Sequence, residues 1–392
     1  MSDGVAALAC RTLRLRNYRN FQTLDLEIPA SGIAVIGDNG SGKTNLLESI
    51  YYLEIFRSFR GSADEQLVRG GEAAFHVGAW FEDGGTGTRV EVAAGYELKM
   101  RTKRVTVDGV EPDRIGDAIG RARAVIFSPS DLAMVTGGPA ERRRFLDIVL
   151  SVNVTGYLGA LQTYRLALRQ RNALLRKGAA VAHIGAFDPP FIEAGARIVS
   201  ERARWIDRHA AGFARRYAAV GDGAQASIAY RPGLRIEPDA ALDAGLARVV
   251  LEHEIERVAD RERDRGMTVI GPHRDDMAIA MSMDGREVEL RDFGSGGQLR
   301  TAAIALRLIE AESVRHARGS APIVLLDDVF AELDAGRSVR LLETLEAEGH
   351  GQVILTAPKE SDVRLRSVKG AESIAQLPRL GILAGRITVY GE

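Results

Sequence analysis

Eight consecutive residues constrain the fold of this chain more than any other stretch: Gly37-Asp38-Asn39-Gly40-Ser41-Gly42-Lys43-Thr44. They match the pattern G-x-x-x-x-G-K-[ST], in which a glycine-rich loop joins a strand to a helix and wraps around phosphate groups. Residues 33–36 form a short apolar run, which is typical of a buried strand. Residues 45–53 carry apolar side chains at helical spacing. The sequence therefore predicts a strand, a phosphate-binding loop and a helix in succession.

The chemistry of this loop follows from its residue types. The glycines allow a tight wrap that directs N–H groups at phosphate oxygens, and the helix N-terminus favours an anion. Lys43 is expected to reach the β- and γ-phosphates of a nucleotide, and the Thr44 hydroxyl is expected to ligate Mg²⁺. We therefore expect all eight residues to bind nucleotide, with Lys43 also taking part in catalysis.

The composition narrows the remaining possibilities. A length of 392 residues allows two or three domains, and the 27% of charged residues is ordinary for a soluble globular protein. The formal net charge of −1 gives no overall attraction to nucleic acid, so any such binding must come from a local basic patch. A single cysteine, Cys10, excludes an internal disulfide framework and suits a reducing cytoplasm. No stretch approaches the roughly 20 apolar residues of a membrane span.

The chain changes character along its length. Polar and apolar residues alternate within 11–28 and 75–107, which is typical of strands in a half-buried sheet. From 139 to about 265 the pattern is mainly helical and rich in arginine. Sheet character returns at 267–270, where the sequence predicts another strand.

Two further stretches are suited to a nucleotide site. Ser295-Gly296-Gly297-Gln298 precedes a strongly helical run at 299–314, so it offers a second anion site at a helix N-terminus. Residues 323–326 form an apolar strand that ends in Asp327 and Asp328. A carboxylate at a strand end suits Mg²⁺, so Asp327 is expected to bind the metal. Asp328 is expected to orient the attacking water as a general base.

The order of these motifs indicates a class of protein. A phosphate loop followed at a distance by a Ser-Gly-Gly-Gln helix is the arrangement of ABC ATPases, in which the serine helix of one subunit completes the ATP site of another. The separation of 32 positions between Ser295 and Asp327 is closer to the heads of SMC and Rad50 proteins than to a transporter domain. We therefore predict an α/β fold, a Rad50/SMC-like ABC ATPase head with mixed sheets around the phosphate loop. The head is expected to be discontinuous, 1–138 and 267–392, with 139–266 inserted as a mainly helical arm domain.

Beyond this class, the chain resembles the RecF family of bacterial recombination mediators over nearly its whole length. The stretches that carry the resemblance are the phosphate loop with Asn45-Leu46-Leu47-Glu48, Arg57-Ser58-Phe59-Arg60, Ser128-Pro129-Ser130-Asp131-Leu132, Glu141-Arg142-Arg143-Arg144-Phe145-Leu146-Asp147, Gly271-Pro272-His273-Arg274-Asp275-Asp276, and Leu325-Leu326-Asp327-Asp328-Val329 with Glu332-Leu333-Asp334. The arginine and histidine stretches do not belong to ATP-binding heads in general, so they are the discriminating ones.

The resemblance implies an activity and a set of partners. It implies a homodimer that forms on ATP and Mg²⁺, hydrolyses ATP slowly and binds gapped DNA, where single-stranded and duplex DNA meet. It also implies cooperation with RecR and RecO in loading RecA during replication-gap repair and the SOS response. Carried over to this chain, Ser295 acts on the γ-phosphate of the partner's nucleotide, with Gly296, Gly297 and Gln298 beside it.

Three positions depart from the pattern of the wider class. Asp328 stands where most members have glutamate, and the shorter side chain fits a slow switch better than a pump. Thr356 stands where many related heads carry histidine, so a γ-phosphate contact there is in doubt. Residues 128–132 lie where related heads have their Q-loop, yet they include no glutamine.

Several interpretations stay open at this point. Arg57 and Arg60 are either DNA-phosphate contacts or plain surface arginines. The chain as a whole is alternatively the ATP-binding head of another SMC- or Rad50-like repair complex. Three more distant rivals are a transport or translation ATPase of the same class, a P-loop kinase, and an adaptor that binds ATP without hydrolysing it.

Overall fold

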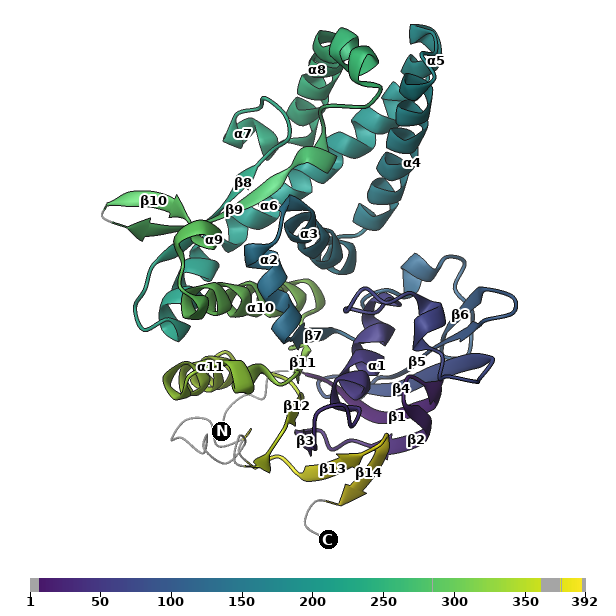
Figure 1. The fold of residues 1–392 in the computed structure, drawn as a ribbon, viewed down its shortest axis with the longest axis vertical. Coiled ribbons are helices and arrows are strands. Elements are labelled where there is room, and N and C mark those ends of the chain that lie inside the picture. The colour runs from purple at the N-terminus through teal and green to yellow at the C-terminus, as the bar shows by residue number, and fades with distance from the viewer. Residues whose placement is uncertain (1–6, 284, 361–373, 375, 390–392) are drawn as a thin grey trace. The chain divides into compact units, whose positions relative to one another are not determined.

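The computed structural model describes residues 7–283, 285–360, 374 and 376–389 (Figure 1). Contacts divide the chain into two compact units. Unit 1 comprises Met1–Asp131, Ala219–Gly223 and Ala303–Glu392, and unit 2 comprises Leu132–Ala218 and Ala224–Ala302. Within the described residues, no helix is both long and apolar enough to span a bilayer.

A six-stranded sheet forms the centre of unit 1. Its order is β14-β13-β3-β12-β11-β7, and every neighbouring pair is parallel except β13 with β14. Parallel strands are normally covered on both faces, which explains why their sequences are nearly continuous apolar runs. The strands predicted from residues 33–36 and 323–326 are confirmed as β3 and β11. The strands are β3 (Gly32–Ile36), β7 (Ala124–Phe127), β11 (Ile323–Leu326), β12 (Val353–Ala357), β13 (Arg379–Leu383) and β14 (Arg386–Val389).

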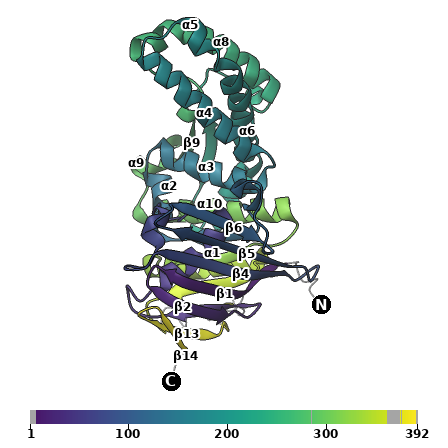
Figure 2. The ribbon, with the colours of Figure 1, turned by 90° about the vertical axis from the view of Figure 1, so that its right-hand side faces the viewer.

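A second sheet of unit 1 is antiparallel, with the order β2-β1-β4-β5-β6. Its residues alternate between one buried and one exposed face, as the sequence predicts for a half-buried sheet. In Figure 2 the strands of this sheet lie in front of α1, which packs against β4 and β5. The strands are β1 (Leu8–Tyr18), β2 (Phe21–Glu27), β4 (Ala74–Asp83), β5 (Arg89–Glu97) and β6 (Thr102–Val107).

The helices of unit 1 cover the six-stranded sheet. The side chains of α10 and α11 form a buried cluster with strand residues such as Val324 and Leu326. Burial of apolar area of this kind is the main favourable contribution to the stability of the fold. The elements are α1 (Lys43–Ile55), α10 (Gly296–Arg318, whose residues up to Ala302 belong to unit 2), α11 (Ala335–Ala347), η1 (Asp64–Leu67), η2 (Ile115–Ala118), η3 (Pro129–Leu132) and η5 (Val329–Glu332).

Unit 2 is mainly helical and contains one three-stranded antiparallel sheet, in the order β10-β9-β8. Its helices are α2 (Ala133–Thr136), α3 (Pro139–Asn153), α4 (Tyr157–Arg176), α5 (Val181–Gly185), α6 (Asp188–Val220), α7 (Pro238–Ala241), α8 (Ala244–Arg265), α9 (Leu290–Phe293) and η4 (Pro272–Arg274). The strands are β8 (Ala226–Arg231), β9 (Asp276–Met283) and β10 (Arg286–Glu289).

The second unit is larger than the insertion expected at 139–266. Residues 276–289 join it because β9 pairs with β8, and β10 pairs with β9. Periodicity within 267–302 indicates strands and a helix, but it does not reveal which sheet those strands enter. The expected domain boundaries, with 267–302 in the head, therefore remain a prediction. In the structure, residues 267–302 belong to unit 2.

The prediction of a strand at 267–270 is wrong. These residues have no regular secondary structure. The Thr268 N–H donates to Asn172 Oδ1 at 2.7 Å, and the Val269 N–H donates to Glu262 Oε1 at 2.9 Å. Side chains of α4 and α8 thus take the donors that a strand would offer to a neighbouring strand.

Candidate nucleotide-binding site

The predicted phosphate-binding loop joins β3 to α1, as its sequence requires. Gly40 and Gly42 have φ angles of 80° and 119°, in the left-handed region that glycine adopts without strain. Asn20, in the turn between β1 and β2, donates from Nδ2 to the Ser41 carbonyl at 2.9 Å. A Cβ atom on Gly42 would lie 2.5 Å from that same Nδ2. Gly42 is therefore required both for its backbone angle and for the close approach of Asn20.

Lys43 is folded over the loop that precedes it. Its side chain is 4% exposed, and Nζ donates to the carbonyls of Gly37 at 2.8 Å and Asp38 at 3.2 Å. The nearest acid is Asp328, whose Oδ2 lies 3.8 Å from Nζ. The ammonium group is thus held at the mouth of the loop, where a phosphate would replace carbonyl oxygens as its partner.

The Thr44 hydroxyl meets Asp327, although 283 positions separate them. Thr44 Oγ1 donates to Asp327 Oδ1 at 2.9 Å. Burial raises the pKa of Asp327 to about 6, and hydrogen bonds from Thr44 and Thr356 offset part of this effect. The predicted pair of metal ligands therefore lies together at the carboxyl ends of β3 and β11.

Thr356 connects both aspartates. Its hydroxyl donates to Asp327 Oδ1 at 3.1 Å and accepts the N–H of Asp328 at 3.0 Å. Asp328 has a φ angle of 47°, an uncommon value for a residue other than glycine. The sequence marks Thr356 only as a departure from histidine, whereas the structure assigns its hydroxyl to fixing the two acids.

The residues around the loop fit a magnesium–nucleotide complex. A threonine hydroxyl and a carboxylate oxygen are the hard donors that Mg²⁺ prefers. The described residues contain no group of three or more His, Cys, Asp or Glu side chains placed to hold a metal. A magnesium ion usually takes most of its remaining ligands from phosphate and water, so two protein ligands are sufficient. The buried Ser41 Oγ has no hydrogen-bond partner in the described part of the chain, so it is free to bind a phosphate oxygen.

Ser295 lies immediately before α10, in unit 2. The Ser295 N–H donates to Gln298 Oε1 at 2.8 Å, and the Gln298 N–H donates to Ser295 Oγ at 3.3 Å. This reciprocal pair is a capping box, which satisfies two N–H groups at the start of the helix and fixes the geometry of its first turn. Ser295 and Gly296 are exposed, and Gly297 and Gln298 are partly exposed. Their predicted action on the nucleotide of a second subunit stays a prediction.

Arg57 and Arg60 follow α1, and both are exposed. Arg60 Nη1 donates weakly to Asn45 Oδ1 at 3.4 Å, and the positive charge of Arg60 is among the influences that lower the pKa of Asp327. Arg60 is therefore on the nucleotide side of unit 1. Contact of either arginine with DNA remains a prediction.

The stretch at 128–132 is held by its own aspartate. Asp131 Oδ2 accepts the Ser128 N–H at 2.8 Å, and Asp131 Oδ1 accepts from Arg307 at 2.6 Å. Arg307 also contacts Glu310 at 2.6 Å. These contacts give the segment a structural role in unit 1 without a glutamine.

Two of the discriminating stretches, 141–147 and 271–276, meet inside unit 2. Arg142 forms a bidentate pair with Asp276, at 2.6 and 2.9 Å. Arg202 on α6 is buried and donates to both Asp147 and Asp275 at 2.7 Å. A buried charge of this kind is stable only when it is paired on several sides. Arg142 and Asp276, which are 134 positions apart in the sequence, are thus joined by an ion pair.

His273 belongs to the same region and has a structural role. Its Nδ1 lies 2.6 Å from the Tyr164 hydroxyl, and its Nε2 lies 3.2 Å from the Thr268 carbonyl. Burial lowers the pKa of His273 to about 4, so the ring is neutral at pH 7. A neutral ring that bonds two neighbours stabilises unit 2 and is not available as a free acid.

Comparison with known proteins identifies the family of this chain. No family model matches the chain. The chain is 35% identical over 345 residues to the DNA replication and repair protein RecF of Synechococcus sp. (strain JA-3-3Ab), covering 86% of this chain and 88% of that protein. It is 32% identical over 368 residues to RecF of Bacillus cereus (strain G9842), covering 92% and 95%. The chain belongs to the RecF family.

Solved structures support the RecF fold. The structure of the recombination mediator protein RecF-ATPrS in the RecFOR pathway superposes with a TM-score of 0.86 at 29% identity, covering 99% of this chain and 100% of that one. The Smc head domain of Pyrococcus furiosus superposes with a TM-score of 0.56 at 14% identity, which shows a shared fold alone. The predicted fold class, an α/β Rad50/SMC-like ABC ATPase head with a mainly helical second domain, is thus confirmed, and so is the resemblance to RecF.

Proposed function

We propose that this RecF-family chain is an ATP-switched DNA-binding protein that acts as a recombination mediator. The observation that carries the proposal is the contact of Thr44 with Asp327 beside a complete phosphate loop. A hydroxyl, a carboxylate and the Lys43 ammonium lie close together there, which supports the binding of a magnesium-bound triphosphate. The relatives named RecF are DNA replication and repair proteins, and solved RecF structures hold ATP, which supports the same assignment.

Within this proposal, each residue of the loop has a role. The N–H groups and Ser41 bind phosphate oxygens, Lys43 bridges the β- and γ-phosphates, and Thr44 and Asp327 hold the cation. Magnesium supplies charge neutralisation and geometry for the phosphates when bound. Asp328 accepts a hydrogen bond from the attacking water, and Thr356 fixes its direction by bonding its backbone N–H. Because the aspartate side chain is short, we expect slow turnover.

The proposed dimer uses the exposed start of α10. Ser295 with Gly296, Gly297 and Gln298 binds the γ-phosphate held by a second copy, because an exposed helix N-terminus beside a serine hydroxyl favours an anion. ATP is then shared between two copies, and its hydrolysis releases them.

The proposed ligands beyond ATP are gapped DNA and the proteins of the RecFOR pathway. We propose binding where single-stranded and duplex DNA meet, contact with RecR, and cooperation with RecO in loading RecA. This activity would serve replication-gap repair and the SOS response in the cytoplasm. The alternative, a head of another SMC- or Rad50-like complex, is less favoured because the chain covers 88% to 95% of the length of these RecF relatives.

Sedimentation of the purified chain with a non-hydrolysable ATP analogue tests the switch. We expect a dimer only with the analogue and Mg²⁺, and retention of gapped DNA only under the same conditions. Ser295→Arg is expected to bind nucleotide but to remain monomeric, because its bulk and charge occupy the place of the γ-phosphate contact. Lys43→Ala is expected to lose both properties.

Two results would contradict the proposal. Equal DNA retention with and without nucleotide would show that ATP is not the switch. A Ser295→Arg variant that still dimerises would show that α10 does not face the partner's nucleotide. Steady-state phosphate release separates a slow ATPase from an adaptor that only binds ATP.

A further inference from the structure

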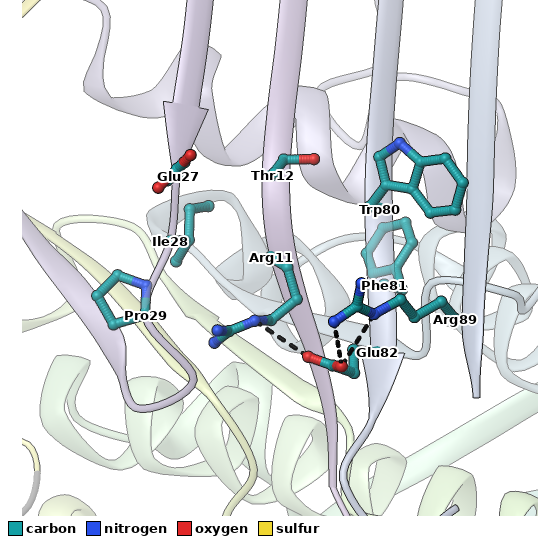
Figure 3. Close-up of a pocket in the computed structure, with 9 residues that line it drawn as sticks. All are labelled: Arg11, Thr12, Glu27, Ile28, Pro29, Trp80, Phe81, Glu82 and Arg89. Atoms are coloured by element: carbon teal, nitrogen blue, oxygen red, sulfur yellow. Dashed lines mark hydrogen bonds and ion pairs between the residues drawn. The ribbon is translucent and has the colours of Figure 1, made fainter. Parts of the chain in front are cut away.

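The exposed face of the antiparallel sheet in unit 1 contains a pocket of about 690 Å³ (Figure 3). It lies over β1, the end of β2 and β4, and it is separate from the phosphate loop. A volume of this size is typical of small-molecule and nucleotide sites. The lining residues are Arg11, Thr12, Glu27, Ile28, Pro29, Trp80, Phe81, Glu82 and Arg89.

A β-bulge at Arg11 builds this pocket. Cys10 pairs with Phe81 and Thr12 pairs with Trp80, so Arg11 has no partner residue on β4. A bulge redirects side chains, and here the consecutive residues Arg11 and Thr12 both line the pocket. Trp80 pairs with Thr12, and the Arg11 guanidinium lies at Glu82, further along β4 (Figure 3). A regular strand would have directed one of these two side chains into the core.

The two arginines of the pocket are held by a single acid. Glu82 lies 3.2 Å from Arg11 Nε and 2.9 Å from Arg89 Nη2. The Arg11 and Arg89 side chains are 39% and 68% exposed, so the guanidinium edges that Glu82 does not use face solvent. Glu82 therefore positions two hydrogen-bond donors at one end of a pocket that has an indole ring as its wall.

The charge of the pocket decides which ligand it fits. Arg11 and Arg89 are balanced by Glu27 and Glu82, so the pocket gains little from a densely charged ligand such as duplex DNA. An indole face with guanidinium donors beside it suits a planar ring that carries one phosphate. Aromatic side chains on open sheets bind single-stranded nucleic acid in this way, through stacking of an unpaired base.

We propose that this pocket binds one nucleotide of single-stranded DNA, with the base stacked on Trp80 and its phosphate at Arg11 and Arg89. The proposal rests on the DNA-binding part of the proposed function and adds a site for the unpaired strand. Duplex DNA is excluded from the pocket because its bases are already stacked within the helix. Binding here is driven by stacking, and the single phosphate contact limits its salt dependence to a slope of about −0.7.

The chain offers a direct probe, since it has two tryptophans. Trp205 is 4% exposed and packs against Phe145 and His209 in unit 2. In a Trp205→Phe background the emission therefore comes from Trp80 alone. We expect saturable quenching of this emission by an oligodeoxythymidine of about ten nucleotides, and no quenching by a blunt duplex of equal length.

Variants measure the contribution of each group to oligodeoxythymidine affinity. Trp80→Leu is expected to raise Kd roughly 5- to 150-fold, the usual range for losing one stacked base, whereas Trp80→Phe keeps most of the affinity. Glu82→Gln removes a negative charge and is expected to tighten binding. Arg11→Gln is expected to weaken it, while the matched control Arg101→Gln, an exposed arginine in the turn between β5 and β6 that pairs with Glu65, leaves it unchanged.

The outcomes separate this site from the switch. Nucleotide-dependent retention of gapped DNA by the wild-type chain, combined with unchanged Trp80 emission and unchanged affinity in Trp80→Leu, would overturn the pocket and leave the switch intact. Quenching by a peptide but not by the oligonucleotide would also overturn it. Loss of ATP-dependent retention in the wild-type chain, with quenching by oligodeoxythymidine preserved, would contradict the switch alone.

Discussion

Glu54 lies in the last turn of α1, the helix that begins at Lys43, and its pKa makes a sharp prediction possible. Its side chain is 2% exposed, and neither carboxyl oxygen has a hydrogen-bond partner of normal geometry in the described part of the chain. Burial raises the pKa from 4.5 to about 7. The Arg318 guanidinium and the N–H groups of Arg123 and Ala124 offset only part of this effect.

The direction of the effect on stability follows from proton binding. Between pH 4.5 and about 7 the folded chain binds a proton at Glu54 more tightly than the unfolded chain does, so stability falls as pH rises through this window. A pKa difference of this size corresponds to about 3 kcal/mol of unfolding free energy, fully lost above pH 7. Glu54→Gln replaces the neutral acid by a group of the same shape that cannot ionise. The variant should therefore match the wild type below pH 4.5 and exceed it by about 3 kcal/mol at pH 8.

Thermal unfolding of the nucleotide-free protein from pH 4.5 to pH 8 measures this difference. For a unit of this size, about 3 kcal/mol corresponds to a Tm difference of about 6 to 12 °C at pH 8. Glu97→Gln at the exposed end of β5 is the matched control, because it removes the same charge without a burial effect. If the Tm of Glu54→Gln and the Tm of the wild type changed in parallel across this pH range, Glu54 would be ionised in the folded protein and the reasoning would be wrong.

Three further substitutions test the two units. Lys43→Arg should still bind ATP, but its rate of phosphate release should fall to about one tenth of the wild-type rate or lower, because a guanidinium fits the loop poorly; unchanged turnover would show that the site is misplaced. Thr356→Val should lower the unfolding free energy by about 1 to 3 kcal/mol, since it leaves the Asp328 N–H without its acceptor, whereas Thr356→Ser should retain it; chemical denaturation compares them. Arg202→Met should destabilise unit 2 by about 3 to 5 kcal/mol, because it removes the buried guanidinium that pairs with both Asp147 and Asp275, and Arg204→Met two residues along should have little effect when both are followed by denaturant unfolding.

The phosphate loop could be predicted because its residues act locally. Gly40 and Gly42 determine the backbone angles, and Lys43 and Thr44 are adjacent to them in the sequence. The contact of Thr44 with Asp327 could also be predicted, since the carboxyl ends of parallel strands meet at one edge of a sheet. What periodicity did not reveal is that β12 lies between β3 and β11 and brings Thr356 against both aspartates.

Other features depend on contacts with residues far away in the sequence, which no local sequence pattern indicates. Asn20 is a polar residue in a turn between two strands, and nothing in its neighbourhood indicates that it bonds Ser41. The 267–270 run has the apolar character of a strand, yet side chains from distant helices take its N–H groups. His273 is similar, because burial beside Tyr164 decides its protonation state and only the fold determines that burial.

The contact between Asn20 and Gly42 has a practical consequence for anyone who needs a version of this protein that ignores ATP. Replacing Gly42 forces a side chain into the Asn20 amide and into an unfavourable backbone angle, so the effect of such a mutation combines damage to the loop with loss of the ligand. Lys43→Ala keeps Gly42 and the hydrogen bond from Asn20 to the Ser41 carbonyl, which makes it the cleaner choice for an inert comparison protein.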